Sequence, residues 1–331
     1  MLNIALLGCG RIGQVHARSL ARIEGARVAA VCDALPEAAA ALAAATGAEA
    51  RDPDAIFGRP GLDAVVIGTP TDTHFDLIHA AAAAGLAIFC EKPVDLDAAR
   101  IRACARAVAD AGVPFLTAFN RRFDPSFADL RARLHGGEIG DPEIVTITSR
   151  DPSPPPLSYI AGSGGLFRDM MIHDLDMARW LLDEEPVRVQ ATGAALIDPE
   201  IGAAGDVDTA AVMLTTASGR IAQIGCSRRA TYGYDQRIEV HGSLGMLRAG
   251  NRLETTVEAA GPAGFRRAPA QHFFLERYAD GYLAEMRAFV DALRTGTPPT
   301  PSIADGLRAQ VLADAADTAC REGRVVVLDD G

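Results

Sequence analysis

The sequence contains no long apolar run, no run of basic residues and no close pair of cysteines. A membrane-spanning helix needs about eighteen or more consecutive apolar residues, and no such stretch occurs. The first residues, MLNIALLGCG, lack the basic start and long apolar segment of a secretory signal. With 32 basic against 43 acidic residues and a net charge of −11, neither nucleic acid nor an anionic membrane is expected as a partner.

The cysteines are few and widely separated. They are Cys9, Cys32, Cys90, Cys104, Cys226 and Cys320, and no two have the spacing of a metal-binding pair. Most fall in predicted strands or helices, which is typical of small buried thiols in a reducing compartment. We therefore expect a cytoplasmic protein that binds no metal through these residues.

What the chain does have is ample material for a core. It is 49% apolar with a mean hydropathy of +0.10, and 331 residues are too many for one ordinary core, so two domains are expected. The first 120 residues alternate between apolar runs and alanine-rich helical stretches, which predicts a parallel sheet with helices on both faces. The expected strands are 3–7, 27–32, 64–68, 87–90 and 114–119, and the expected helices are 12–23, 36–46, 73–84 and 97–111.

Beyond residue 120 strand-like segments dominate. Ser218 and Gly219 form a hairpin signal between two of them, so this second sheet should be largely antiparallel. We expect strands at 143–149, 187–197, 207–216, 220–227, 236–241 and 246–248, and helices near 124–134, 169–182, 278–294 and 303–322. The fold class is thus α/β, with a doubly wound domain over 1–120 and a second α/β domain over 121–331. The Pro/Gly-rich segment 151–166 predicts a long, functional loop.

The first predicted strand runs into the motif GCGRIG, in which Gly8, Gly10 and Gly13 match G-x-G-x-x-G. A strand precedes the motif, a helix follows it, and Asp33 lies twenty residues after Gly13 at the end of the next strand. This context is the dinucleotide-binding fingerprint, with the pyrophosphate held at the helix N-terminus. An ordinary glycine-rich turn is the alternative.

Asp33 indicates which dinucleotide is bound. A carboxylate here accepts hydrogen bonds from the adenosine ribose and repels the 2′-phosphate of NADP, and Ala34, Leu35 and Pro36 offer no compensating cation. NAD is therefore the expected cofactor. Alternatively, Asp33 serves only as a loop or helix cap.

Two further predicted strands end in polar residues. Glu91 and Lys92 directly follow strand 87–90, and the carboxyl ends of parallel strands are where ligands bind in such sheets. Lys92 could stabilise negative charge on a substrate oxygen, or it could be a solvated surface lysine. Pro93 holds it extended, with a bond that could be cis. Thr69 and His74, after strand 64–68, could line the nicotinamide end of the groove, although His74 could equally cap its helix.

The segment 164–182, GGLFRDMMIHDLDMARWLL, is predicted to form one helix with two unlike faces. Met171, Leu175, Ala178 and Leu182 form an apolar stripe. Asp169, His173 and Asp176 gather on nearly the opposite side. Three alternatives remain for the polar face: Asp169 as an N-cap, His173 as an interior histidine, or the two as a metal pair without a further ligand nearby.

These motifs, in this order, resemble the Gfo/Idh/MocA family of NAD(P)-dependent sugar and polyol dehydrogenases. The resemblance covers essentially the whole chain and rests on GCGRIG, GTPTDTH, CEKP, FNRRFDP and RDMMIHDLDMARW. It implies an N-terminal Rossmann domain and a second domain whose open, mainly antiparallel sheet commonly packs into tetramers. It also implies NAD as the cofactor and a small polyol as the substrate.

The resemblance assigns roles to individual residues. The catalytic set is Lys92, Asp169 and His173. The cofactor-binding set is Gly8, Gly10, Arg11, Ile12, Gly13, Asp33, Thr69, His74, Glu91 and Lys92. The substrate-binding set is Arg122, Asp151, Asp176 and Tyr232, and no residue is assigned to a metal.

These residues support the oxidation of a secondary alcohol. His173 would take the hydroxyl proton, because histidine titrates near neutral pH, and Asp169 would orient its ring and stabilise the imidazolium. Lys92 would stabilise the developing alkoxide. The alternatives are another sugar dehydrogenase, an NAD-dependent glycosidase, or a non-catalytic sensor that binds the dinucleotide. A sensor would have no need of all three residues together.

Overall fold

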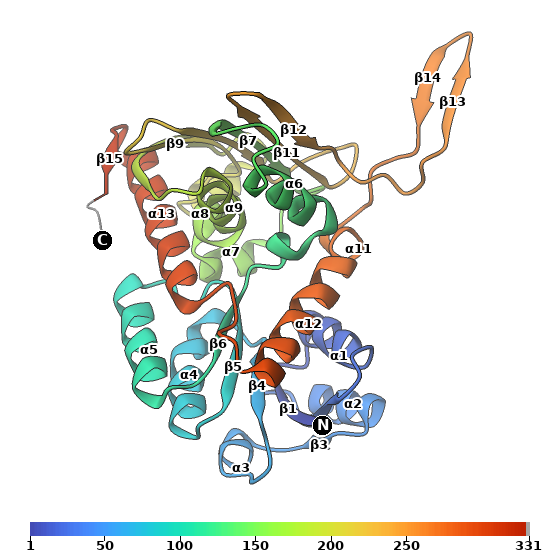
Figure 1. The fold of residues 1–331 in the computed structure, drawn as a ribbon, viewed down its shortest axis with the longest axis vertical. Helices are drawn as coiled ribbons and strands as arrows, with labels where there is room; N and C mark the ends of the chain where they lie inside the picture. Colours follow the sequence, from blue (N-terminus) through green and yellow to red (C-terminus); the bar gives the residue numbers. More distant parts are fainter. Residues whose placement is uncertain (329–331) are drawn as a thin grey trace. The chain divides into compact units, whose positions relative to one another are not determined.

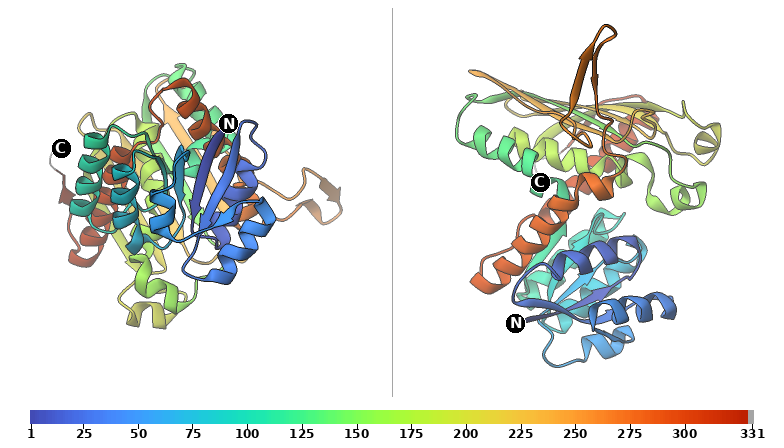
Figure 2. Two further views of the ribbon diagram at one scale, coloured as in Figure 1. Left: turned by 90° about the horizontal axis from the view of Figure 1, so that it is seen from below. Right: turned by 90° about the vertical axis from the view of Figure 1, so that its right-hand side faces the viewer.

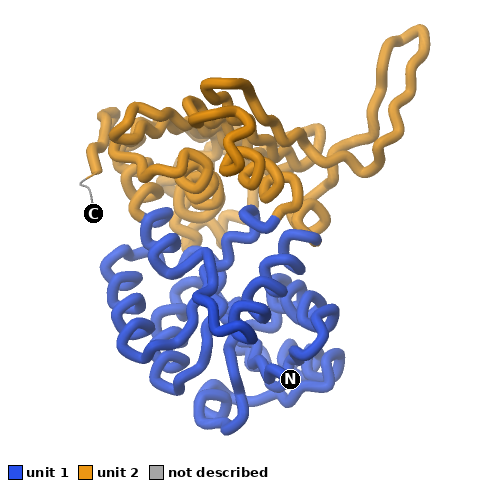
Figure 3. The backbone as a smooth tube through the Cα atoms, viewed as in Figure 1, with its two compact units in different colours: residues 1–123, 280–310 blue, residues 124–279, 311–331 orange. Residues whose placement is uncertain are grey.

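A computed structural model describes residues 1–328, and its contacts divide the chain into two units. Unit 1 comprises residues 1–123 and 280–310, and unit 2 comprises residues 124–279 and those from 311 on (Figure 3). The sequence predicts one boundary, after residue 120. The structure instead returns residues 280–310 to unit 1, so the second domain is not the continuous segment 121–331.

The sheet of unit 1 is parallel and six-stranded. Its order, β3-β2-β1-β4-β5-β6, is the doubly wound arrangement of dinucleotide-binding domains. The strands are β1 (Leu2–Leu7), β2 (Ala26–Cys32), β3 (Glu49–Ala50), β4 (Ala64–Ile67), β5 (Ala87–Glu91) and β6 (Phe115–Ala118). Five were predicted, and only the two-residue β3 was not.

Helices cover both faces of this sheet (Figure 2). They are α1 (Arg11–Leu20), α2 (Pro36–Thr46), α3 (Pro53–Phe57), α4 (His74–Ala83), α5 (Ala98–Ala111), α12 (Ala279–Thr295) and the start of α13 (Ile303–Glu322), with short 3₁₀ turns η1 (Thr71–Thr73) and η2 (Asn120–Phe123). Met286, Phe289 and Val290 of α12 share one core with Leu6 and Phe89 of the sheet. This packing explains why a late segment of the chain belongs to unit 1.

Unit 2 is built on a seven-stranded mixed sheet of order β12-β11-β7-β10-β9-β8-β15. Its strands are β7 (Pro142–Arg150), β8 (Pro186–Ala194), β9 (Thr209–Thr216), β10 (Ile221–Ser227), β11 (Asp235–Gly242), β12 (Gly245–Ala249) and β15 (Val326–Val327). Only the pair β7–β10 is parallel, and the hairpin β9–β10 turns at the predicted position, with Gly219 at φ +94°. The expected mainly antiparallel sheet is confirmed.

Helices lie on one face of this sheet only (Figures 1 and 2). They include α6 (Pro125–His135) against β12 and α9 (Ile172–Leu182) against β7 and β10. Burial alternates accordingly along β9, where Val212 and Leu214 are buried while Ala211 and Met213 are exposed. The other face of the sheet is therefore open within the described chain. Among residues 1–328, no helix is long and apolar enough to cross a membrane.

Several elements of unit 2 were not predicted. They are the two-residue strand β15, the short helices α7 (Leu157–Ser163), α10 (Pro199–Ala203) and α11 (Phe274–Arg277), and the hairpin formed by β13 (Glu258–Gly261) and β14 (Gly264–Arg267). Every residue of that hairpin's strands is exposed, and it projects from the rest of unit 2 (Figure 1).

The helix predicted over 164–182 is broken in two. Gly164 and Gly165, at the start of α8 (Gly165–Asp169), both have φ above +80°. The helix then breaks at Met170 and Met171, and α9 begins at Ile172. Asp169 is thus the last residue of α8 and not the N-cap of a helix. The predicted apolar stripe is confirmed, because Met171, Leu175, Ala178 and Leu182 are all fully buried. The predicted polar side is not exposed along its whole length, because Asp176 is buried as well.

Candidate active site

The glycine turn of unit 1 has the geometry that a dinucleotide requires. A Cβ on Gly8 would lie 2.5 Å from the carbonyl oxygen of Gly68, and one on Gly13 would lie 1.9 Å from that of Gly8. A Cβ on Gly10 would meet nothing within 4 Å. Gly10 is the N-cap of α1, whose start has no side-chain cap and no acidic residue in its first turn. Gly8 and Gly13 therefore allow close backbone packing, and Gly10 leaves the helix N-terminus open for an anion.

Two alanine substitutions should separate these roles. In Gly13→Ala the new methyl group collides with backbone, so we expect a lower melting temperature and loss of NAD binding. Gly10→Ala should fold with a normal melting temperature but bind NAD more weakly, because its methyl group occupies the space into which a pyrophosphate would fit. Calorimetric titration with NAD and thermal unfolding would check both. Normal NAD affinity in Gly10→Ala would contradict this assignment.

Asp33 holds the turn from the neighbouring strand. Its Oδ2 accepts a 2.6 Å hydrogen bond from the Cys9 amide, and its Oδ1 accepts one of 2.9 Å from the Leu35 amide. The carboxylate thus caps the loop, as the alternative interpretation expected. Each oxygen retains a second lone pair, so capping does not prevent Asp33 from accepting the ribose hydroxyls.

Lys92 follows β5 and is the only lysine in the sequence. The Lys92–Pro93 peptide is cis. The Glu91 carboxylate accepts a 3.3 Å hydrogen bond from the Lys92 amide and lies 2.8 Å from Nε2 of His16, a fully buried residue of α1. The nucleotide-binding helix and the strand that carries Lys92 are therefore joined through Glu91. Sequence reasoning missed His16, although its place one turn after Gly13 could have suggested it.

His74 is buried behind this strand end. Its Nδ1 lies 3.0 Å from the carbonyl oxygen of Pro93, and its Nε2 lies 3.0 Å from that of Thr69. Burial lowers the pKa of His74 below its ordinary value. The imidazole thus ties the loop after β4 to the peptide that follows Lys92, and we infer that it positions these segments. Thr69 is fixed on the other side by a 2.6 Å hydrogen bond from the Thr73 hydroxyl.

Glu285 of α12 is a buried acid that the sequence did not reveal as unusual. Its side chain is fully buried, and neither carboxyl oxygen has a hydrogen-bond partner among the described residues. Burial, reinforced by the charge of Glu91, raises the pKa of Glu285 well above its ordinary value. An uncharged carboxyl is the form that such a site favours.

This shift predicts a pH-dependent stability. In the folded protein Glu285 keeps its proton up to its raised pKa, whereas in the unfolded protein it loses the proton near the ordinary pKa of glutamate. The free energy of unfolding should therefore fall as pH rises from the ordinary pKa towards the raised one. Glu285→Gln removes this contribution and should flatten the decline in unfolding free energy between pH 5 and pH 9. Urea denaturation across this range would measure it. Glu37→Gln, at an exposed position of α2, is the control and should retain the slope of the unmodified protein.

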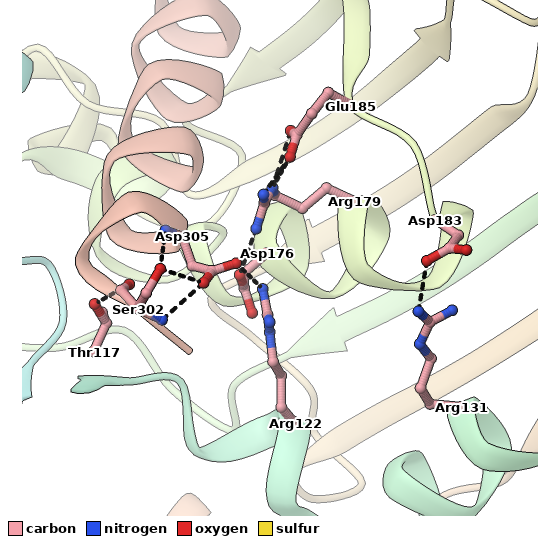
Figure 4. A network of polar contacts seen from close by, with 9 residues as sticks. All are labelled: Thr117, Arg122, Arg131, Asp176, Arg179, Asp183, Glu185, Ser302 and Asp305. Carbon is pink, nitrogen blue, oxygen red and sulfur yellow. Dashed lines mark hydrogen bonds and ion pairs between the residues drawn. The ribbon is translucent and has the colours of Figure 1, made fainter. Parts of the chain in front are cut away.

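Arg122, predicted to bind substrate, has a fixed place in unit 1 (Figure 4). Its guanidinium donates a 2.9 Å hydrogen bond to Asp305, whose other carboxyl oxygen accepts bonds from the amide and hydroxyl of Ser302. Thr117 of β6 donates to the carbonyl oxygen of Ser302. The start of α13 therefore orients Arg122, a connection across more than half of the chain.

In unit 2, Asp169 is held by two residues that sequence reasoning missed. Its Oδ1 accepts a 3.0 Å hydrogen bond from the Tyr159 hydroxyl of α7, and its Oδ2 lies 3.9 Å from the guanidinium of Arg228. Burial, followed by the charge of Asp169, raises the pKa of Tyr159 above its ordinary value, so the hydroxyl stays a donor. His173, partly buried in the first turn of α9, follows four residues later.

The remaining predicted substrate residues lie in two other parts of unit 2. Asp176 is buried in α9, 3.6 Å from Arg179, which also binds Glu185 (Figure 4). Asp151 follows β7, and its amide donates to the carbonyl oxygen of Ser227 at the end of β10.

Tyr232 is half exposed. Its hydroxyl donates to Asp235 and accepts from Arg150, each at 2.7 Å. Asp151 and Tyr232 thus place polar groups at the end of the sheet where the loop after β7 begins. Within residues 1–328, no group of three His, Cys, Asp or Glu side chains has the arrangement of a metal site.

Comparison with known proteins bears on this geometry. The model of an oxidoreductase family with an NAD-binding Rossmann fold matches residues 2–119, and that of the GFO/IDH/MocA C-terminal domain matches residues 127–248. A relative from Rhizobium meliloti named inositol 2-dehydrogenase is 54% identical, over 99% of each chain. The chain belongs to the Gfo/Idh/MocA family. It is an NAD-dependent oxidoreductase that acts on CH–OH groups, as the motifs predicted.

Solved structures of this family agree closely in fold. A myo-inositol dehydrogenase from Corynebacterium glutamicum superposes with a TM-score of 0.96, at 45% identity over all of each chain. The scyllo-inositol dehydrogenase of Lactobacillus casei, solved with NAD(H) and scyllo-inositol, gives 0.92 at 30% identity over 99% of each chain. Family, fold class and cofactor are thereby confirmed.

Proposed function

We propose that this Gfo/Idh/MocA enzyme oxidises myo-inositol to 2-keto-myo-inositol (scyllo-inosose), with NAD as the hydride acceptor. One observation carries the choice of substrate: similarity to relatives named inositol or myo-inositol dehydrogenase extends over the full chain at 45–54% identity. The segments NRRFDPSF, SRDPSPPP and YGYDQR, which lie outside the nucleotide motif, support the same choice.

The residues present fit NAD. Gly10 leaves open space at the start of α1, and a pyrophosphate there would meet unpaired backbone N–H groups. The Asp33 carboxylate would hold the adenosine ribose and disfavour a 2′-phosphate. Arg11, Ile12, Thr69 and Glu91 complete the proposed cofactor-binding set. When bound, NAD supplies the carbon that accepts hydride.

The protein's own task is then to handle one proton and one developing negative charge. We assign the proton to His173, which takes it from the substrate hydroxyl as the C–H bond breaks. Asp169 stabilises the imidazolium so formed, and its carboxylate is itself fixed by Tyr159 and Arg228. The Lys92 ammonium stabilises the alkoxide-like oxygen. Arg122, Asp151, Asp176 and Tyr232 are proposed to select which hydroxyl is presented.

A substrate panel tests this function. Purified protein would be incubated with NAD and, separately, with myo-inositol, scyllo-inositol, glucose and galactose, and NADH would be followed at 340 nm. Myo-inositol should give the highest kcat/KM. No NADH with either inositol would refute the proposal. A response to a hexose alone would indicate a sugar dehydrogenase, and NAD binding without turnover would indicate a sensor.

We also propose that the enzyme is a cytoplasmic homotetramer. Support for assembly comes from the open face of the seven-stranded sheet, on which Met213 and Met246 are each more than 40% exposed. Support for a reducing compartment comes from the six cysteines, which are free thiols and mostly buried. Light scattering on purified protein would measure the mass in solution.

A further inference from the structure

Arg228 is a buried cation between two carboxylates of unit 2. It directly follows β10, is 1% exposed, and is fixed by a 2.8 Å hydrogen bond from its amide to the carbonyl oxygen of Asp208. One terminal nitrogen of its guanidinium lies 3.9 Å from Asp169, and the other lies 3.5 Å from Asp206. Its Nε is buried without a hydrogen-bond partner among the described residues. Such a buried guanidinium requires nearby negative charge.

The two carboxylates stand at opposite ends of the same short helix. Asp206 accepts a 2.9 Å hydrogen bond from the Leu166 amide in the first turn of α8, and Asp169 is the last residue of that helix. Arg228 therefore links the start of α8 to its end. The carboxylate of Asp169 is thereby fixed at one oxygen by Tyr159 and faces a positive charge at the other.

We propose that Arg228 is a positioning residue of the reaction: it acts as the counter-ion of Asp169 and so sets the proton affinity of His173. This rests on the proposed function, in which His173 is the base. A lone Asp169 carboxylate would favour the imidazolium form of His173. The guanidinium offsets part of that charge, so it weakens this preference before reaction while Asp169 still favours the imidazolium as the proton is taken.

Five charged or titratable groups are linked to this site. Tyr159 on α7 and Arg228 after β10 contact Asp169, and Asp206 before β9 contacts Arg228. Asp151 after β7 acts on Tyr159, and His173 follows Asp169 by four residues in α9. Arg228 is the one cation among these five, and Asp151 and Asp206 would both favour the imidazolium. Removal of Arg228 should therefore move the titration of His173 upward.

Arg228→Met tests this inference with Arg168→Met as a matched control. Arg168 also lies between two carboxylates, 2.6 Å from Asp314 and 3.0 Å from Asp317, and it is the neighbour of Asp169 on the same helix. In Arg228→Met we expect the acidic limb of the kcat/KM profile to move up by about one pH unit, with lower kcat and unchanged affinity for NAD. Arg168→Met should lose stability without that shift.

Two further measurements keep the inference testable. Arg228→Lys, which retains the charge, should restore the position of the acidic limb, and it provides the comparison if Arg228→Met does not fold. An NMR titration of ¹³C-labelled histidine, with His173 assigned by its loss in His173→Gln, needs no turnover and should show the same upward shift. An unshifted His173 in Arg228→Met, or an equal shift in Arg168→Met, would overturn the inference. Absence of inositol oxidation by the unmodified protein would overturn only the proposed function.

Discussion

Replacing His173 with alanine is expected to lower kcat for inositol oxidation by about 10²- to 10⁴-fold, the usual contribution of a positioned general base. Without the imidazole, the hydroxyl proton must leave to water while hydride departs, and the transition state loses its acceptor. NAD binding should be retained, because the glycine turn and Asp33 lie in unit 1 and His173 lies in unit 2. Steady-state turnover and calorimetric titration with NAD would measure the two properties separately.

Lys92→Ala should show the same separation of turnover from NAD binding, for a different reason. It removes the positive charge proposed to face the developing alkoxide, and loss of one such electrostatic contact costs about 10²- to 10³-fold in kcat. Lys92→Arg preserves the charge and should retain more activity than Lys92→Ala. Because Lys92 is the only lysine, ¹³C reductive methylation would label it and the chain terminus alone, and NMR would report its titration directly.

His241→Ala is a suitable control for both substitutions. His241 lies on β11, and its side chain is 57% exposed beside Glu143. Its removal should leave kcat unchanged. Full activity in either His173→Ala or Lys92→Ala would refute the role assigned to that residue, whatever the substrate proves to be.

The fold of unit 1 could be predicted because its strands are short apolar runs, each followed by a helical stretch and a turn. That local pattern fixes the strands and the place of the glycine motif. It does not fix what α12 packs against. The apolar side chains Met286, Phe289 and Val290 show that α12 is amphipathic, but only the folded core shows that their partners are in the first part of the chain.

The candidate site is proposed on similar grounds. Residue type and the ends of strands led to Lys92, and the spacing expected of one helix led to Asp169 and His173. The groups that hold them are distant in sequence or lie in loops: Arg228 is far from Asp169 along the chain, and His16 is 75 residues from Glu91. The break between α8 and α9 falls at Met170 and Met171, where the Met171 amide donates to the carbonyl oxygen of Leu166 five residues earlier, which a period of 3.6 residues cannot reveal.

Arg277→Met is expected to destabilise unit 2 by about 3–5 kcal/mol, the usual result of removing one partner from a buried ion pair. Arg277 and Asp124 are both completely buried and form a two-point ion pair, and the guanidinium also lies 5.2 Å from the ring centre of Phe127. Asp124 has a second task as the N-cap of α6, where it accepts bonds from the amides of Ser126 and Phe127. Loss of Arg277 leaves the Asp124 carboxylate buried without a partner of opposite charge.

The only tryptophan, Trp180, lies in α9 of unit 2, so its fluorescence during urea denaturation reports the unfolding of this unit. The double variant Asp124→Ser and Arg277→Met removes both charges but keeps a hydroxyl that can cap α6. It should recover much of the lost stability, because the penalty arises from the unpaired charge and not from the missing attraction. Arg267→Met, which breaks an exposed pair on the β13–β14 hairpin, should change little. If Arg277→Met were no more destabilising than Arg267→Met, the buried pair would have no such role.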